Sequence, residues 1–298
     1  MKKVFILFLT LILIACSNTK KSDNTLVDNI EVTPEDMYTS ILLDDVDSVR
    51  LFLDNGFSVD KVDTTGETLV IKAVKSNSLE VLELLIKRKA SLERGTYPYI
   101  RKNTDIEVPG RTPLYFVKSQ EALGILISGG ADINYVNSKG EPLLIDYIKY
   151  KSENYTKTLI DNNVRVNVAD GELWSPLIWA SVNGQNEIVE KLIGAGADMN
   201  FGDSKGNYAI YYSYNKEVIS LLINDMYDLN HRNSDGERVM GEVYLKCVAN
   251  GYVDEVRRLL DTDIDVNYMS YGDTAMSLAQ ENRDAEMLDL LQSRGAVE

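Results

Sequence analysis

A sequence pattern that recurs most often at intervals of 33 residues constrains the fold of this chain more than any other feature. Each copy contains an apolar helical segment, then a small residue, then a β-branched or apolar residue ahead of Asp, Glu or Asn. The closing residue falls at positions 60, 93, 134, 167, 200, 230 and 267. A period of this length indicates a repeat architecture, in which each unit buries its apolar face only against its neighbours.

The residues near each boundary agree with helices joined by tight turns. A turn glycine follows five of the closing residues, at Gly66, Gly140, Gly206, Gly236 and Gly272. Thr112-Pro113 and Ser175-Pro176 predict helix starts, because the hydroxyl can cap free N–H groups and Pro tolerates the first turn.

The position four residues before each closing residue should take a left-handed backbone conformation, which favours glycine and asparagine. Suitable residues stand there in four repeats: Gly56, Gly130, Asn163 and Gly196. Lys89, Met226 and Asp263 are unsuitable, so we expect those repeats to end their second helices differently.

This combination resembles the ankyrin repeat, a unit of about 33 residues with a turn, two helices and a projecting finger loop. The resemblance implies an all-α solenoid of about seven to eight helix-turn-helix units over residues 34–298. It also implies a non-catalytic protein that binds a protein partner through its concave face and finger loops. The histidine of the family's Thr-Pro-Leu-His signature is missing, and its position carries Ile71, Tyr115, Ile145, Ile178 and Tyr211.

The third repeat carries an insertion in its finger turn, at residues from about 94 to 109. Gly110 stands 17 positions after Glu93, whereas the other repeats show about six, so about 11 residues are added. Tyr97, Tyr99 and Arg101 make this stretch basic and aromatic, and Tyr and Arg are frequent anchors of interfaces. We predict that these three residues contact the partner. A tolerated surface insertion with locally packed tyrosines is the alternative.

Aromatic residues recur on the first helices. The third and sixth repeats each lack three residues where the first helix ends. Phe116, Trp179 and Tyr212 hold equivalent places in the third, fifth and sixth repeats, which predicts an aromatic column on the concave face. Such a column is either an interaction face or a set of larger core residues that fill space left by the missing turns.

The sixth repeat is rich in tyrosine. We expect Tyr208 and Tyr211 to lie in the core. We expect Trp179, Tyr212 and Tyr214 to lie on the surface, and we take these three as candidates for partner binding.

The N-terminus resembles a bacterial lipoprotein signal. Met1-Lys2-Lys3 is basic, and the apolar run from Val4 to Ala15 is shorter than the roughly 20 residues that span a bilayer. The run ends in Leu13-Ile14-Ala15-Cys16, which is similar to a lipobox. The resemblance implies a signal peptide over residues 1–15 and lipidation of Cys16. An ordinary signal peptide or a buried strand is the alternative.

Processing before Cys16 would place the chain in the bacterial cell envelope, anchored to the inner or outer membrane through two or more acyl chains. Residues 16–33 are polar and predict a flexible, lipidated tether ahead of the repeat domain at 34–298. The mature chain would carry 29 cationic against 46 acidic side chains, a charge of −17.

Composition excludes several classes of function. A formal charge of −15 argues against binding a phosphate backbone, so we expect no nucleic-acid partner. His231 is the only histidine, and we expect it to be exposed near a finger tip. Cys247 has no disulfide partner once Cys16 is acylated, and we expect it to be a buried thiol. We predict no catalytic residue, cofactor, metal site or small-molecule substrate.

Two functions remain compatible with these features. The first is a lipid-anchored envelope protein that holds a protein partner. The second is an immunity or inhibitor lipoprotein that sequesters a secreted toxin or an envelope enzyme. Both would use the same surface, and no residue of the chain separates them.

Overall fold

The computed structural model describes residues 33–297 except 101–106, 109, 224–227 and 229. The proposed signal peptide, Cys16, nearly all of the tether and Arg101 therefore lie outside the described residues. Thr33 opens the described chain and caps the first helix: its hydroxyl accepts from Asp36 N at 3.2 Å, and its own N–H donates to the Asp36 carboxylate at 3.1 Å.

Over the described residues the helices form eight consecutive helix-turn-helix pairs, which we call repeats 1 to 8. The pairs are α2 (Pro34–Leu42) with α3 (Val46–Asp54), α4 (Leu69–Ser76) with α5 (Leu79–Lys87), η1 (Pro113–Phe116) with α6 (Gln120–Ser128), α7 (Leu143–Tyr150) with α8 (Glu153–Asp161), α9 (Pro176–Val182) with α10 (Asn186–Gly194), α11 (Ala209–Tyr212) with α12 (Lys216–Leu222), α13 (Val239–Ala249) with α14 (Val253–Leu260), and α15 (Ala275–Asn282) with α16 (Ala285–Ser293).

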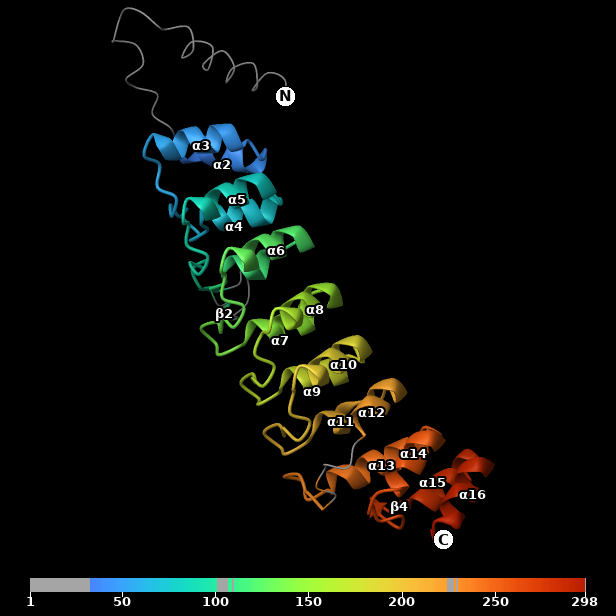
Figure 1. Ribbon diagram of the computed structural model, residues 1–298. Helices are drawn as coiled ribbons and strands as arrows, with labels where there is room; N and C mark the ends of the chain where they lie inside the picture. Colours follow the sequence, from blue (N-terminus) through green and yellow to red (C-terminus); the bar gives the residue numbers. More distant parts are fainter. Residues whose placement is uncertain (1–32, 101–106, 109, 224–227, 229, 298) are drawn as a thin grey trace, which may run out of the picture.

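The pairs stack into an elongated solenoid, with α2 and α3 at one end and α15 and α16 at the other (Figure 1). First helices pack on first helices and second helices on second helices, while the finger loops project along one side. One continuous apolar core runs from Met37 to Leu291 through all the repeats. The predicted all-α solenoid is confirmed, and the core grows by adding repeats rather than by enlarging a centre.

Two short antiparallel hairpins extend the fingers. Strand β1 (Tyr99–Ile100) pairs with β2 (Glu107–Val108) inside the insertion, and β3 (Met269–Ser270) pairs with β4 (Asp273–Thr274) ahead of α15.

Both predicted helix starts are confirmed, since η1 begins at Pro113 and α9 at Pro176. The Ser175 hydroxyl caps α9 by accepting from Ile178 N at 3.2 Å. Thr68, which was not predicted, caps α4 in the same way by accepting from Ile71 N at 3.2 Å. Thr112 forms no such bond, because the three missing residues leave only a 3-10 turn, η1, after it. Pro113 and Pro176 are the first residues of their helices, whereas Pro142 lies one position earlier in its repeat and immediately precedes α7.

The expected left-handed positions are confirmed, and one further residue joins them. Gly56, Gly130, Asn163 and Gly196 all have positive φ. Lys89 was expected to differ but has φ of 60°, so that expectation is wrong. Its repeat still closes with the same bonds, from Lys89 N to Ile86 O and from Ala90 N to Leu85 O, which offset the cost of a side chain in this conformation.

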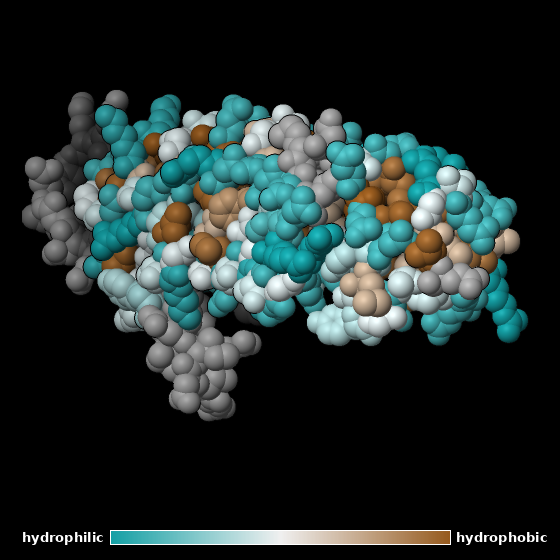
Figure 2. Space-filling view, turned by 90° about the horizontal axis from the view of Figure 1, so that it is seen from below, coloured by the Kyte–Doolittle hydropathy of each residue, from teal (hydrophilic) through white to brown (hydrophobic). Residues whose placement is uncertain are grey.

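The repeats that depart from the period change their first helix. Helices η1 and α11 are four residues long, as the missing residues of repeats 3 and 6 predict, whereas α13 has 11. Among the residues that the structure describes, no helix has the length and apolar character needed to cross a bilayer. The face seen in Figure 2 is mostly hydrophilic, with hydrophobic residues in separate small areas.

Candidate functional site

Four aromatic rings from repeats 5 and 6 lie in contact, and we call Trp174, Trp179, Tyr212 and Tyr211 the aromatic stripe. Ring centroids are 4.8 Å apart for Trp174 and Trp179, 4.7 Å for Trp174 and Tyr212, and 5.4 Å for Tyr212 and Tyr211. All four rings are partly buried against the core, and each keeps part of its surface open to solvent. The stripe therefore runs from the finger and first helix of repeat 5 to the first helix of repeat 6.

A carboxylate holds the polar tip of three of the rings. The Trp179 indole N–H donates to Asp170 at 2.8 Å, and the Tyr211 hydroxyl donates to Glu237 at 3.0 Å. The Tyr212 hydroxyl donates to Asp203 and accepts from the Asn207 side-chain amide at 3.1 Å. Rings with satisfied tips lose little further freedom on binding, so the stripe is organised before any partner arrives.

Two of these carboxylates, those of Asp170 and Asp203, come from one recurring position, the first residue of each finger turn. Asp170 Oδ1 accepts from Glu172 N at 3.1 Å and Trp174 N at 3.0 Å, which leaves Oδ2 for Trp179. Asp203 accepts from Lys205 N and Asn207 N in the same way, both at 2.9 Å. The local turn thus aims one carboxylate oxygen at the first helix of its own repeat.

Electrostatics around the stripe follow from burial and these bonds. Burial, and then the hydrogen bond to Asp203, raise the pKa of Tyr212 to about 12. Hydrogen bonds from Asn233, Tyr271 and Tyr211 outweigh partial burial and hold the pKa of Glu237 below its usual range. At neutral pH the hydroxyl groups therefore remain protonated donors, and the carboxylate remains charged.

Two lysines flank the stripe. The Lys149 ammonium lies 4.4 Å from the centre of the Trp179 ring, and that of Lys246 lies 4.3 Å from the Tyr214 ring. Lys246 also donates to the backbone oxygens of Tyr211 and Ser213. Burial lowers the pKa of Lys246 to about 8.

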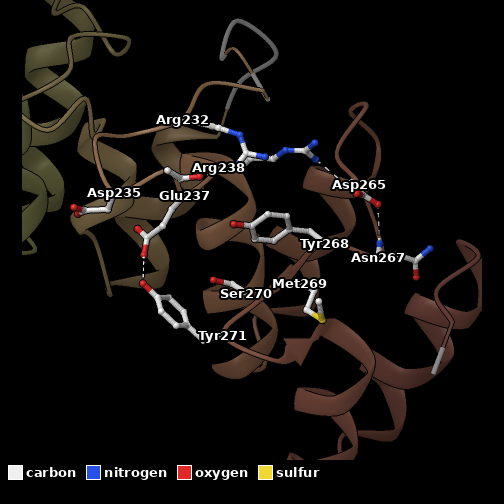
Figure 3. Close-up of a pocket in the computed structure, with 11 residues that line it drawn as sticks. Arg232, Asp235, Glu237, Arg238, Asp265, Asn267, Tyr268, Met269, Ser270 and Tyr271 are labelled. Atoms are coloured by element: carbon white, nitrogen blue, oxygen red, sulfur yellow. Dashed lines mark hydrogen bonds and ion pairs between the residues drawn. The ribbon is translucent and has the colours of Figure 1, made fainter.

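An open cup of about 510 Å³ lies beyond the stripe, between the fingers of repeats 7 and 8 (Figure 3). Glu237 joins the two features, because it accepts from Tyr211 at the end of the stripe and from Tyr271 at 2.7 Å across the cup. Arg238 faces Asp265 at 3.7 Å on another wall, so the cup carries charges of both signs.

The aromatic residues predicted in repeats 5 and 6 differ in how deeply they are buried. Tyr214 is 71% exposed, and Tyr208 is buried, as expected. Tyr211 is only partly buried and belongs to the stripe together with Trp179 and Tyr212.

The predicted column is interrupted, so Phe116 does not continue the line of Trp179 and Tyr212. Asp146 takes the equivalent place on α7 between them, and the Phe116 ring instead lies under the Lys75 ammonium at 4.5 Å. Ile145 holds the histidine position of repeat 4, so the next residue, Asp146, brings a carboxylate to this line.

His231 corrects another expectation, because it is partly buried rather than exposed. Its Nε2 lies 2.7 Å from Gly206 O, and its ring stacks on Tyr208 with centroids 4.9 Å apart. The side chain bridges the fingers of repeats 6 and 7, a contact between residues 25 positions apart that local pattern did not indicate.

The insertion lies on another part of the surface, against the finger of repeat 2. Tyr97 is 54% exposed, and its N–H donates to Thr65 O at 3.3 Å. Tyr99 is placed in strand β1, and Arg101 lies outside the described residues. The structure therefore does not unite the insertion candidates with the stripe.

Sequence reasoning missed Trp174 and the three carboxylates Asp170, Asp203 and Glu237. For Asp170 and Asp203 the available signal was the Asp or Asn that begins each finger turn, at Asp63, Asn137, Asp170, Asp203 and Asn233. Glu237 and Trp174 lie outside this pattern. Cys247 is buried, and burial raises the pKa of its thiol to about 12. Within the described part of the chain, no three His, Cys, Asp or Glu side chains converge as a metal site would require.

Comparison with protein families identifies two segments. Residues 116–203 match the family model described as ankyrin repeats (3 copies), and residues 41–86 match the one described as ankyrin repeats (many copies). Together the two matches begin in repeat 1 and end in the finger of repeat 6.

Several relatives are similar to this chain over more than half of its length. A putative ankyrin repeat protein of Borreliella burgdorferi is 28% identical over 67% of this chain and 76% of its own length. The B-cell lymphoma 3 protein homolog of Mus musculus is 27% identical over 65% of this chain and 42% of its own length. The ankyrin repeat domain-containing protein SAT10 of Stachybotrys chartarum is 25% identical over 55% of this chain, which spans only 8% of that protein.

Solved structures agree on the fold. The ankyrin repeat domain of Bcl-3 superposes with a TM-score of 0.53 at 18% identity, over 88% of this chain and 99% of that one. The human ASB11 ankyrin repeat domain gives the same TM-score at 19% identity, over 72% of this chain and 98% of that one. At these identities the likeness shows the fold alone.

Proposed function

This chain has an ankyrin-repeat helical fold, and from that premise we propose that it is a non-catalytic protein that binds a protein partner through the aromatic stripe. Ankyrin repeats imply protein–protein interaction. The position of the stripe limits the proposed binding surface to repeats 5 and 6 and the neighbouring finger of repeat 7.

The observation that carries the proposal is the set of rings fixed by carboxylates. Trp and Tyr are enriched among residues that dominate binding energy, and rigid rings cost little entropy to bury. Two exposed tyrosines extend the surface: Tyr214, whose ring lies under Lys246, and Tyr271, which donates to Glu237.

Charge favours a basic partner. Asp170, Asp203 and Glu237 line the stripe, and the chain as a whole is acidic, so long-range steering would speed the approach of a cationic protein. This effect is expected to weaken as ionic strength rises.

The proposed location is the bacterial envelope, with the repeat domain tethered by lipid on Cys16. This part of the proposal rests on Leu13-Ile14-Ala15-Cys16 and the basic, apolar start of the chain. Lipid and a short tether would keep the stripe near the membrane, where an envelope partner would be met at high local concentration.

Site-specific photo-crosslinking tests the binding surface. A photoreactive phenylalanine analogue replaces Tyr214, which is 71% exposed beside the stripe, or Leu42, which is 67% exposed in repeat 1. We expect a discrete crosslinked protein from position 214 in membranes and not from position 42. The same products from both positions, or none from position 214, would contradict the proposal. The captured protein distinguishes a held envelope component from a sequestered toxin or enzyme.

A further inference from the structure

A small pocket, which we call the notch, opens between repeats 3 and 4, next to Lys149 at the edge of the aromatic stripe. It has a volume of about 270 Å³ and is lined by Arg111, Tyr115, Asp146, Tyr150 and Lys151. Tyr115 is 4% exposed and Asp146 is 8% exposed, so two of the polar residues that line it are buried.

Two buried polar atoms of the notch have no hydrogen-bond partner among the described residues: Arg111 Nε and the Tyr115 hydroxyl. A buried donor left unpaired destabilises the fold, so unpaired groups of this kind rarely persist without a ligand or water to bond to them. Both atoms carry a hydrogen that they can donate, so an acceptor of one kind can bond to both.

Both the backbone and the side chain of Arg111 are held in place. The backbone pairs with Thr96 at the base of the insertion: Arg111 N donates to Thr96 Oγ1 at 3.2 Å, and Thr96 N donates to Arg111 O at 3.0 Å. The guanidinium lies over the Tyr115 ring at 5.4 Å, and its Nη2 faces Asp146 at 3.6 Å. One edge of the guanidinium is therefore steadied by Asp146, while Nε stays unpaired.

Charge in the notch is opposite to that of the chain. Arg111 and Lys151 face the single carboxylate of Asp146, and the Lys151 ammonium donates to Val117 O at 3.1 Å. Burial lowers the pKa of Lys151, with Arg111 and Lys118 adding to the effect against the opposing pull of Asp146. Burial also raises the pKa of Asp146 despite the nearby cations. The notch is thus a local excess of positive charge on an acidic protein.

We propose that the notch binds a carboxylate group, with Arg111 Nε and the Tyr115 hydroxyl as its donors and Lys151 as the balancing cation. Arg pairs with carboxylates by directed hydrogen bonds, and a guanidinium stacked on an aromatic ring is already oriented for this. The carboxylate would belong either to the C-terminus of a peptide or to an Asp or Glu side chain. This proposal does not depend on the aromatic stripe having a partner.

Side-chain NMR of the full chain labelled with 15N-arginine tests this proposal. The Nε–H signal of Arg111 is assigned from Arg111→Lys and followed while N-acetylglycine or N-acetylaspartate amide is added, at constant ionic strength. These two probes represent a terminal and a side-chain carboxylate. We expect a saturable shift with a Kd of about 1 mM for at least one probe, and the tighter one identifies the source.

Arg258 supplies the matched control, because its guanidinium already donates to Ser220 O, Ser220 Oγ and Ile223 O. Its Nε–H signal should not shift. Tyr115→Phe and Lys151→Met should each weaken binding about 3- to 10-fold while circular dichroism shows the fold retained. The proposal is overturned if Arg258 shifts equally, if ethylammonium chloride gives the same shift, or if no probe saturates below about 10 mM.

Discussion

Tyr97 lies directly against Gly66, so that a Cβ at position 66 would stand 2.6 Å from Tyr97 N and 2.8 Å from the Tyr97 ring. The start of the insertion is therefore packed onto the finger turn of repeat 2. Gly140 holds the equivalent turn position in repeat 4 with a similar φ, 78° against 82°, but no atom lies within 4 Å of its would-be Cβ.

These two glycines separate steric packing from backbone strain. Gly140→Ala should destabilise the protein by about 1 kcal/mol, because it places a side chain in the left-handed region. Gly66→Ala carries the same strain and in addition a clash with Tyr97, for a further loss of about 1–3 kcal/mol. Urea unfolding midpoints would measure both. Equal losses would mean that Tyr97 does not pack on the turn.

Asp170→Asn should release Trp179 without unfolding the finger. Asn forms the same turn at positions 137 and 233, so the backbone bonds are retained, whereas the Trp179 indole N–H loses its acceptor. We expect a loss of about 1–2 kcal/mol and weaker crosslinking from position 214. Trp174 and Trp179 are the only tryptophans in the chain, so intrinsic fluorescence reports the stripe directly.

The control for this variant is Asp198→Asn, which changes an exposed carboxylate that accepts from Asn200 N in its own finger. It should leave fluorescence and crosslinking unchanged. Unaltered emission in Asp170→Asn would show that the bond between Asp170 and Trp179 does not position the ring.

Acid should weaken repeat 2 through Asp63. Burial tends to raise the pKa of this carboxyl, but hydrogen bonds from Lys72 and Thr65 outweigh burial and hold the pKa well below its usual range. Because the folded pKa is depressed, the stabilisation is complete above the unfolded pKa of about 4 and is lost as pH falls below it. Asp63→Asn keeps the turn and removes the 2.6 Å ion pair with Lys72.

We expect Asp63→Asn to lower the free energy of unfolding by about 1–2 kcal/mol at neutral pH and by less at pH ~3. The control is Asp47→Asn, which removes an ion pair between Arg50 and the 87% exposed side chain of Asp47. It should change the free energy of unfolding by at most about 0.5 kcal/mol at either pH. Denaturant titrations at both pH values compare the variants. If Asp63→Asn lowered the free energy of unfolding equally at both pH values, the acid-dependent stabilisation would not come from the Asp63 carboxylate.

Cys16→Ala should abolish the proposed lipid anchor. We expect metabolic labelling with radioactive palmitate to be lost and the protein to leave the membrane fraction. Ser17→Ala changes the next residue and should keep both. Palmitate labelling that survives Cys16→Ala would exclude lipidation at this position.

Much of the fold was predictable, because each repeat is specified by local chemistry. The period, the shortened first helices of repeats 3 and 6 and the burial of Cys247 all follow from apolar spacing along the chain. The errors at Lys89 and His231 have different causes. Local backbone bonds at the end of α5 hold Lys89 in the left-handed conformation. His231 is held by contacts with Gly206 and Tyr208 of the preceding repeat.

The sequence alone determined that the chain holds about seven to eight repeats, their order and the places where the period breaks, since helix propensity and apolar pattern act over short distances. Only the tertiary structure decided which polar groups meet across repeats. Tyr211 and Glu237 are 26 positions apart and form a bond, whereas Arg111 Nε and the Tyr115 hydroxyl lie four positions apart and are left unpaired. Hydrogen bonding is directional and depends on stacking geometry, which the pattern of apolar residues along the chain does not encode.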